Sequence, residues 1–230
     1  MSRVLGLVLM ILVLQGCASG GKARPFEIKN LAKSDIDMVA DSHIRALNDL
    51  VRELTIKLYK RNPRELKKGP PGITVSRRLQ LLLDSPRLIN HPELNGRYGT
   101  DAIPLAFEPD FRGDRVFALM VGISGMLHAS YSYRDEFFML NDIDQQKLFN
   151  SARNLEAIAW RLNNRRQPDG NLFLLSNGIA DNGVPNYSFE RIFGKLIAYQ
   201  DMMAQIVSDK TNRAINSVVV GFASTTLLPI

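Results

Sequence analysis

The sequence predicts an all-α fold, an irregular bundle of about five substantial helices around one buried central helix. Three observations predict it. Apolar residues recur at helical spacing along several long segments. One stretch, Val116 to Tyr133, has neither a formal charge nor a polar face. Strand-like patterning is confined to one short segment, which predicts a single β-hairpin. With 45% apolar residues in a chain of 230, the protein can bury a core without cross-links.

The first helix is predicted from Ser34 to about Arg61. Ser34 can cap it, and Asp37, three residues later, completes a capping box. Its apolar face comprises Ile36, Ala40, Ile44, Leu47, Val51, Leu54 and Leu58. His43 lies in this face without a second metal-ligand side chain one turn away, so we expect a packed residue rather than a ligand.

Two short helices and a long loop are predicted next. One helix spans Arg64 to Lys68, with Asn62 as its cap and Pro63 in its first turn, and the other spans Thr74 to Leu83. The loop, 85–110, is rich in proline and glycine. Its apolar residues predict that it lies over the core: Leu88, Ile89, Leu94, Ile103, Leu105 and Phe107.

The central helix, 116–133, has two interpretations. It is either buried on all sides by other helices or a transmembrane span, which its length just permits. Its serines and His128 would be costly in lipid, which favours the buried helix. Small residues follow one side of it at helical spacing: Ala118, Gly122, Gly125, Ala129 and Ser132. Such a row lets a neighbouring backbone approach closely.

The last third of the chain predicts three further helices and the hairpin. Asp142 is expected to cap a helix from Ile143 to Asn163, with Gln145 at its third position. A strand from Asn171 to Ser176 should turn at Asn177–Gly178, with a second turn at Asp181–Gly183. Ser188 is expected to cap a helix that ends near Ser208.

The final helix is predicted from Thr211 to Leu228. It has its own row of small residues, Ala214, Ser217, Gly221 and Ser224. We predict that this row packs against the small residues of the central helix, so that a leucine at Gly122 or Gly221 would overpack the contact.

A basic start, an apolar run and a single cysteine follow one another at the N-terminus. Met1–Arg3 precedes the run from Val4 to Leu14, which is about half the ~20 residues of a membrane-spanning helix. The run ends in Leu14-Gln15-Gly16-Cys17, and Cys17 is the only cysteine. This order resembles the signal peptide of bacterial lipoprotein precursors, and the resemblance covers residues 1 to about 20.

The resemblance implies that residues 1–16 are a signal peptide that is removed, and that Cys17 carries lipid on its sulfur and its new amino group. Three acyl chains would form a firm membrane anchor, since one chain alone binds only marginally. Ala18 and Ser19 imply sorting to the periplasmic face of the outer membrane. The small and polar composition of the following residues predicts that 17–33 is a tether and 34–230 a single helical domain.

The net charge of +6 is unevenly distributed. Basic residues gather between positions 57 and 78: Lys57, Lys60, Arg61, Arg64, Lys67, Lys68, Arg77 and Arg78. The simplest interpretation is a solvated face. The alternative is a contact with anionic lipid or a cell-wall polymer, because an envelope lipoprotein meets little nucleic acid.

We therefore carry three hypotheses for function, and none of them requires a cofactor or a metal. The first is a non-enzymatic envelope lipoprotein that scaffolds or assists a protein partner. The second is a module that binds anionic lipid or wall polymer through residues 57–78. The third is an enzyme with dispersed catalytic residues, for which the candidates are His43, His128 and the acids Asp135, Glu136, Asp142 and Asp144.

Overall fold

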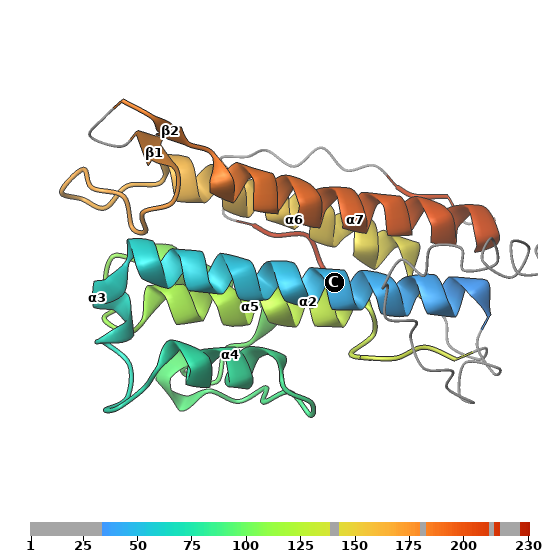
Figure 1. The fold of residues 1–230 in the computed structure, drawn as a ribbon, viewed down its shortest axis with the longest axis horizontal. Helices are drawn as coiled ribbons and strands as arrows, with labels where there is room; N and C mark the ends of the chain where they lie inside the picture. The colour runs from blue at the N-terminus through green and yellow to red at the C-terminus, as the bar shows by residue number, and fades with distance from the viewer. Residues whose placement is uncertain (1–33, 139–142, 180–182, 212–213, 217–225) are drawn as a thin grey trace, which may run out of the picture. The chain divides into compact units, whose positions relative to one another are not determined.

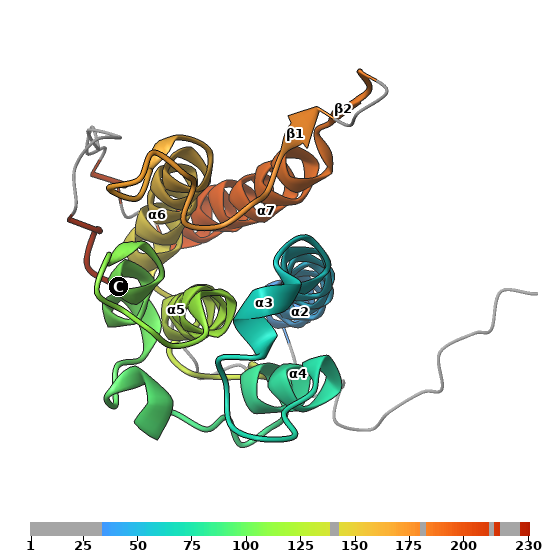
Figure 2. The same ribbon diagram turned by 90° about the vertical axis from the view of Figure 1, so that its left-hand side faces the viewer.

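The computed structural model describes residues 34–138, 143–179, 183–211, 214–216 and 226–230. In that part of the chain, four long helices run side by side (Figure 1). They are α2 (Asp35–Arg61), α5 (Arg115–Ser130), α6 (Gln145–Asn164) and α7 (Ser188–Thr211). Each contacts two others, in the order α2, α5, α6, α7 and back to α2, as the end-on view shows (Figure 2). The predicted all-α class is confirmed.

The helix α2 begins with the predicted capping box. Asp37 N–H donates to Ser34 Oγ over 3.4 Å, and Ser34 N–H donates to Asp37 Oδ2 over 2.9 Å. These bonds satisfy amide groups that an uncapped helix end leaves without partners. Along the helix, the predicted apolar face is buried from Ala40 to Leu58, while Ile36 is half-buried. The first helix therefore has the predicted cap, face and end.

The helix α5 is the centre of the core. Of its residues, only His128 is not fully buried, and α2, α4 (Val75–Leu83) and α6 pack around it. The buried interpretation is therefore confirmed for the helix, which ends at Ser130; Tyr133, the last residue of the predicted helix, lies beyond this end and is 60% exposed. Among the described residues, no helix combines the length and the apolar character that crossing a membrane requires.

The small residues of α5 face a partner other than the predicted one. They pack against two 3-10 helices of the long loop, η3 (Gly99–Asp101) and η4 (Ile103–Phe107). A Cβ at Gly125 would lie 2.9 Å from both Cα and N of Gly99. The predicted pairing with a C-terminal helix is wrong for α5, because the loop already occupies the close-approach side of Gly122 and Gly125.

The loop covers the core, although not with all of the predicted residues. Its three short helices, η2 (Pro92–Leu94), η3 and η4, bury Leu94, Ile103, Leu105 and Phe107. Leu88 and Ile89 were also expected in the core, but they are 47% and 60% exposed. They lie in the connection between α4 and the first of these short helices.

Several boundaries in the other helices differ from the prediction. The cap of α6 is Asp144, whose Oδ1 accepts from Gln146 N–H over 2.8 Å. Asp142, the predicted cap, lies outside the described residues. The short helix α3 spans Pro63–Leu66, and Ser188 is the first residue of α7 rather than its cap. The amide of Asn62 does not cap α3 but bonds to the Leu175 backbone, where Nδ2 donates and Oδ1 accepts.

The hairpin and the C-terminal segment lie elsewhere than predicted. The strands are β1 (Gly178–Ile179) and β2 (Pro185–Asn186), paired antiparallel, and the predicted strand 171–176 forms only a bridge from Leu172 to Arg166. Residues 214–216 and 226–230 are not helical, which contradicts the ends of the predicted helix 211–228. Gly221 lies outside the described residues. Asn154 of α6 holds the terminal segment through both backbone groups of Leu228, its Nδ2 donating and its Oδ1 accepting.

Candidate functional site

Three cations of the predicted basic group at positions 57–78 interact with neighbouring side chains, although Lys68 and Arg77 are also exposed. Lys57 pairs with Glu53, Lys68 pairs with Glu65, and Arg77 donates to Gln80. Four cations project into solvent at the end of α2 and around α3: Lys60, Arg61, Arg64 and Lys67. A contact with an anionic surface can therefore use these four.

Arg78 is not part of that surface. Its side chain is 0% exposed and pairs with Glu93 and Asp114, with Nη2 3.1 Å from Asp114 Oδ2. Its guanidinium lies 3.7 Å from the centre of the Phe117 ring. Asp114 also accepts from Tyr59 Oη over 2.7 Å. The assignment of Arg78 to the anion-binding group was wrong, because the carboxylates of Asp114, the N-cap of α5, and of Glu93 in the loop pair with it in the core.

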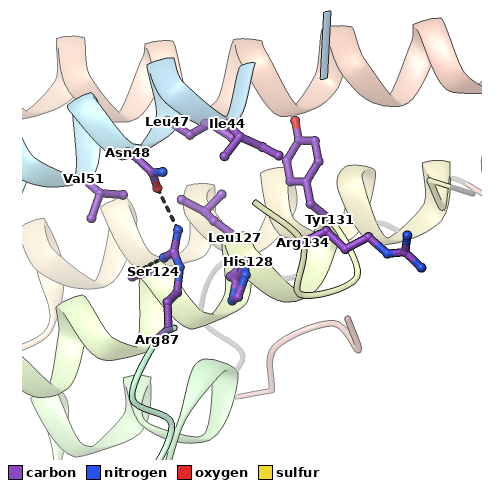
Figure 3. Close-up of a pocket in the computed structure, with 10 residues that line it drawn as sticks. All are labelled: Ile44, Leu47, Asn48, Val51, Arg87, Ser124, Leu127, His128, Tyr131 and Arg134. Atoms are coloured by element: carbon purple, nitrogen blue, oxygen red, sulfur yellow. Dashed lines mark hydrogen bonds between the residues drawn. The ribbon is translucent and has the colours of Figure 1, made fainter. Parts of the chain in front are cut away.

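A second polar cluster lies where the long loop meets α2 and α5 (Figure 3). Arg87 extends from the loop, donating to Ser124 Oγ over 2.7 Å and to Asn48 Oδ1 over 3.0 Å. These three residues line a small cavity together with His128, Tyr131 and Arg134 and with apolar side chains of α2 and α5. Its free space is about 10 Å³ for the centre of a water-sized sphere, which is room for one water molecule.

The chain turns sharply beside this cavity. Ser132 and Tyr133 have φ angles of 56° and 58°, in the left-handed region that non-glycine residues seldom adopt. The turn ends α5, since Tyr133 N–H donates to His128 O over 2.9 Å. It also places the Tyr133 ring edge-on to His128, with centroids 5.5 Å apart, and brings Asp135 near the cluster.

The electrostatics of the cluster keep His128 neutral. Burial is the main cause that lowers its pKa, to about 4, and the Arg87 cation adds to the effect. Asp135 acts in the opposite direction, its Oδ1 lying 3.6 Å from His128 Nε2 and 3.5 Å from Arg87 Nη2. The Nε of Arg87 is buried without a hydrogen bond, and both ring nitrogens of His128 are buried, with the Tyr133 backbone as the hydrogen-bonding neighbour of the ring. The cluster therefore has unused hydrogen-bonding capacity next to a space for one small guest.

This arrangement suits binding better than catalysis. Ser124 Oγ donates its proton to Leu82 O over 3.0 Å and accepts from Arg87, so it is not activated by His128. A histidine with a pKa near 4 is also a weak base at neutral pH. What the site can hold is a water molecule next to the Arg87 guanidinium.

Of the proposed enzyme residues that the structure describes, which exclude Asp142, it shows His128 and Asp135 next to each other. His43 lies elsewhere, its ring 5.5 Å from that of Tyr199, and Asp144 caps α6. Sequence reasoning missed Arg87, which lies in a loop without periodicity and meets Asn48 only through the fold. Among the described residues, no three histidine, cysteine or carboxylate side chains lie close enough together to hold a metal ion.

No family model, curated protein or solved structure matched this chain. The assignment of a function therefore depends on the residues and their geometry.

Acidification should destabilise the protein through His128. Because its pKa is about 4 in the folded chain against 6.5 for an unperturbed histidine, the unfolded chain takes up the proton first. The contribution of neutral His128 to the free energy of unfolding is complete above pH 6.5 and is lost as the pH falls towards 4. The total loss should be about 3 kcal/mol. Urea unfolding at several pH values between 7.5 and 4 would measure it.

The comparison with a His128→Gln variant isolates this effect. Burial raises the pKa of Asp114 to about 6. The effect of Asp114 on the free energy of unfolding therefore has the opposite pH dependence, but it is the same in both chains. The wild-type free energy of unfolding should fall more steeply below pH 6.5 than that of the variant. Parallel curves would show that His128 titrates normally.

Proposed function

We propose that this protein is a lipid-anchored lipoprotein of the bacterial envelope whose helical domain acts as a non-enzymatic scaffold or accessory for a protein partner. The observation that carries the proposal is the sequence Leu14-Gln15-Gly16-Cys17 at the end of a short apolar run, with the only cysteine of the chain at its last position. A diacylglyceryl group on the sulfur and a third chain on the amino group would anchor the protein stably. The address expected from Ala18 and Ser19 is the periplasmic face of the outer membrane.

The accessory role is supported by how the polar groups of the domain are used. Ser124, which lines the same cavity as His128, donates to a backbone carbonyl, and the buried carboxylate Asp114 is held by Arg78 and Tyr59. Neither is poised to react with a substrate. Large apolar side chains are instead exposed on several helices, among them Met38 of α2, Trp160 of α6 and Met202 of α7. Such side chains suit contacts with another protein.

Fatty-acid labelling tests the anchor. Cells grown with an alkyne-bearing fatty acid should label the wild-type protein, and a Cys17→Ala variant should carry no label, because the variant lacks the thiol that accepts the first lipid. Ser19→Ala is the matched control and should label as the wild type does. Label on the Cys17→Ala variant, or none on the wild type, would reject lipidation at Cys17.

Photo-crosslinking in cells tests the partner. A photoreactive residue placed in turn at Met38, Trp160 and Met202 samples three helices at exposed positions, so the substitutions should not disturb the core. A scaffold should give the same crosslinked protein reproducibly from at least one position. The absence of a reproducible product from all three would count against the accessory role even if Cys17 is lipidated.

A further inference from the structure

Four exposed large apolar side chains, including the two most exposed among the described residues, lie at one end of the bundle. Ile179, Tyr187 and Val184 are 75%, 67% and 58% exposed, and Leu175 is 46% exposed. They belong to β1, β2 and the segments beside them, which extend beyond the first turn of α7 (Figure 2). Aliphatic and aromatic groups exposed together at one place are uncommon on a protein that has no use for them. We call Leu175, Ile179, Val184 and Tyr187 the apolar tip.

Cations lie directly beside the apolar tip. The Arg61 guanidinium is so close to β1 that a Cβ at Gly178 would lie 3.2 Å from its Nη2. The amide of Asn62 holds the Leu175 backbone, which fixes the tip against the end of α2. Arg64 is exposed on α3 next to this junction, and Arg191 is exposed in the first turn of α7. The nearby carboxylate of Glu190 accepts hydrogen bonds of 2.7 Å from Asn163 and from Asn177.

We propose that the apolar tip and its cations form a second, reversible membrane contact that inserts into the interface of an anionic lipid bilayer. The proposal rests on the proposed envelope location, which brings such a surface within reach. Branched aliphatic side chains enter the acyl boundary, a tyrosine suits the headgroup level, and arginines pair with lipid phosphates. Each cation near an anionic membrane surface adds to the attraction.

Arg61, beside the apolar tip, lies at the opposite end of α2 from Ser34, which follows the predicted tether in the sequence. With 27 residues at 1.5 Å each, α2 separates Ser34 from Arg61 by about 40 Å. The chain from Cys17 to Ser34 spans at most about 60 Å. The apolar tip can therefore reach the same membrane that holds Cys17.

The side chains of the tip favour lipid over a wall polymer. An anionic polysaccharide would use the arginines and could stack on Tyr187, but it offers no apolar environment for Ile179 and Val184. Those two side chains contribute to binding only where their apolar surface is removed from water. The bilayer interface satisfies the cations and the aliphatic groups together.

Vesicle binding tests the proposal with the chain from residue 18 onward, purified without lipid so that the anchor makes no contribution. This chain should sediment with vesicles containing phosphatidylglycerol and not with phosphatidylcholine vesicles. Reversing two charges, Arg61→Glu with Arg64→Glu, should weaken binding at least tenfold. Replacing the exposed aliphatic residues, Ile179→Ser with Val184→Ser, should weaken it about tenfold.

Matched variants separate this surface from charge and hydrophobicity in general. Arg45→Glu with Arg52→Glu reverses two exposed charges earlier on the same helix, and Met202→Ser removes an exposed apolar group on α7. Both should bind within twofold of the unmodified chain. Equal loss in these controls would overturn the proposal, as would binding that ignores the serine substitutions or no binding to anionic vesicles.

A fluorescent reporter shows whether the tip inserts. Trp160 is the only tryptophan, so Tyr187→Trp in a Trp160→Phe chain places a single indole at the tip. Its emission should shift to shorter wavelength on anionic vesicles and be quenched by brominated lipid. Binding without quenching would indicate a purely electrostatic contact, as with any polyanion, and would overturn insertion. Fatty-acid labelling at Cys17 is independent of all these results, so a failed anchor and a failed second contact are distinguishable.

Discussion

Replacing Arg78 by methionine should lower the free energy of unfolding by about 3–5 kcal/mol, the largest effect we expect from one substitution. Methionine keeps an apolar stem against Phe117, but it leaves the carboxylates of Glu93 and Asp114 without their cation. Asp114 is the more costly of the two, since its side chain is 0% exposed and that of Glu93 is 25% exposed. For a domain of this size the melting temperature should fall by about 10 °C.

Two further variants identify the cause. Arg77→Met removes the neighbouring, exposed guanidinium and should change the stability by less than about 0.5 kcal/mol. Asp114→Asn in the Arg78→Met chain removes the unpaired charge and keeps one oxygen to accept from Phe117 N–H at the α5 cap, while its NH2 group replaces the oxygen that accepts from Tyr59 Oη. It should therefore restore part of the loss. Thermal unfolding followed by circular dichroism gives all three values. If the Arg78→Met chain melts as the wild type does, the buried ion pairs contribute little to stability.

A methyl group at Gly125 should destabilise the fold by about 1–3 kcal/mol. The added Cβ would lie 2.9 Å from Gly99 Cα and N and from Tyr98 Cε1. Two of these three atoms are backbone, so η3 would have to move away from α5. The same reasoning predicts a loss for Gly122→Ala, whose Cβ would collide with the Ile103 side chain and lie 3.1 Å from its N atom.

The matched control for Gly125→Ala is Gly194→Ala. Gly194 lies within α7, and a Cβ there meets nothing within 4 Å. Alanine is the better helix former by up to about 1 kcal/mol, so this variant should be as stable as the wild type or more stable. Urea unfolding should therefore give opposite signs for the two substitutions. A stabilised Gly125→Ala chain would show that η3 does not pack closely on α5.

Whether a feature could be predicted depended on how far apart along the chain its interacting residues are. Features set by neighbouring residues were predictable: the Ser34 capping box, the apolar face of α2 and the fully apolar character of α5. Each results from spacing along a single helix. The residue that caps a helix was harder to predict where two candidates are close in the sequence, as Asp142 and Asp144 are. The hairpin was placed too early because turn residues occur at 169–170, 177–178 and 181–183 alike.

Contacts between distant segments were not predictable from patterns. The small residues of α5 indicated a close neighbour, but spacing carries no information about which segment supplies it, and a loop took the place expected for a helix. Arg78 has the same charge as Lys60 and Arg61 in the sequence, yet it is buried because Glu93 and Asp114 meet it there. Arg87 and His128 came together in the same way.

By itself, the sequence determined the helical class, the cap and face of the first helix, the buried central helix and the motif ending at Cys17, since each is encoded within a few turns of chain. Only the tertiary structure decided which cations remain at the surface and which side chains line the cavity beside Arg87. It also decided that the apolar tip lies next to Arg61. These properties depend on distances between segments far apart along the chain, and the packing of the bundle sets those distances.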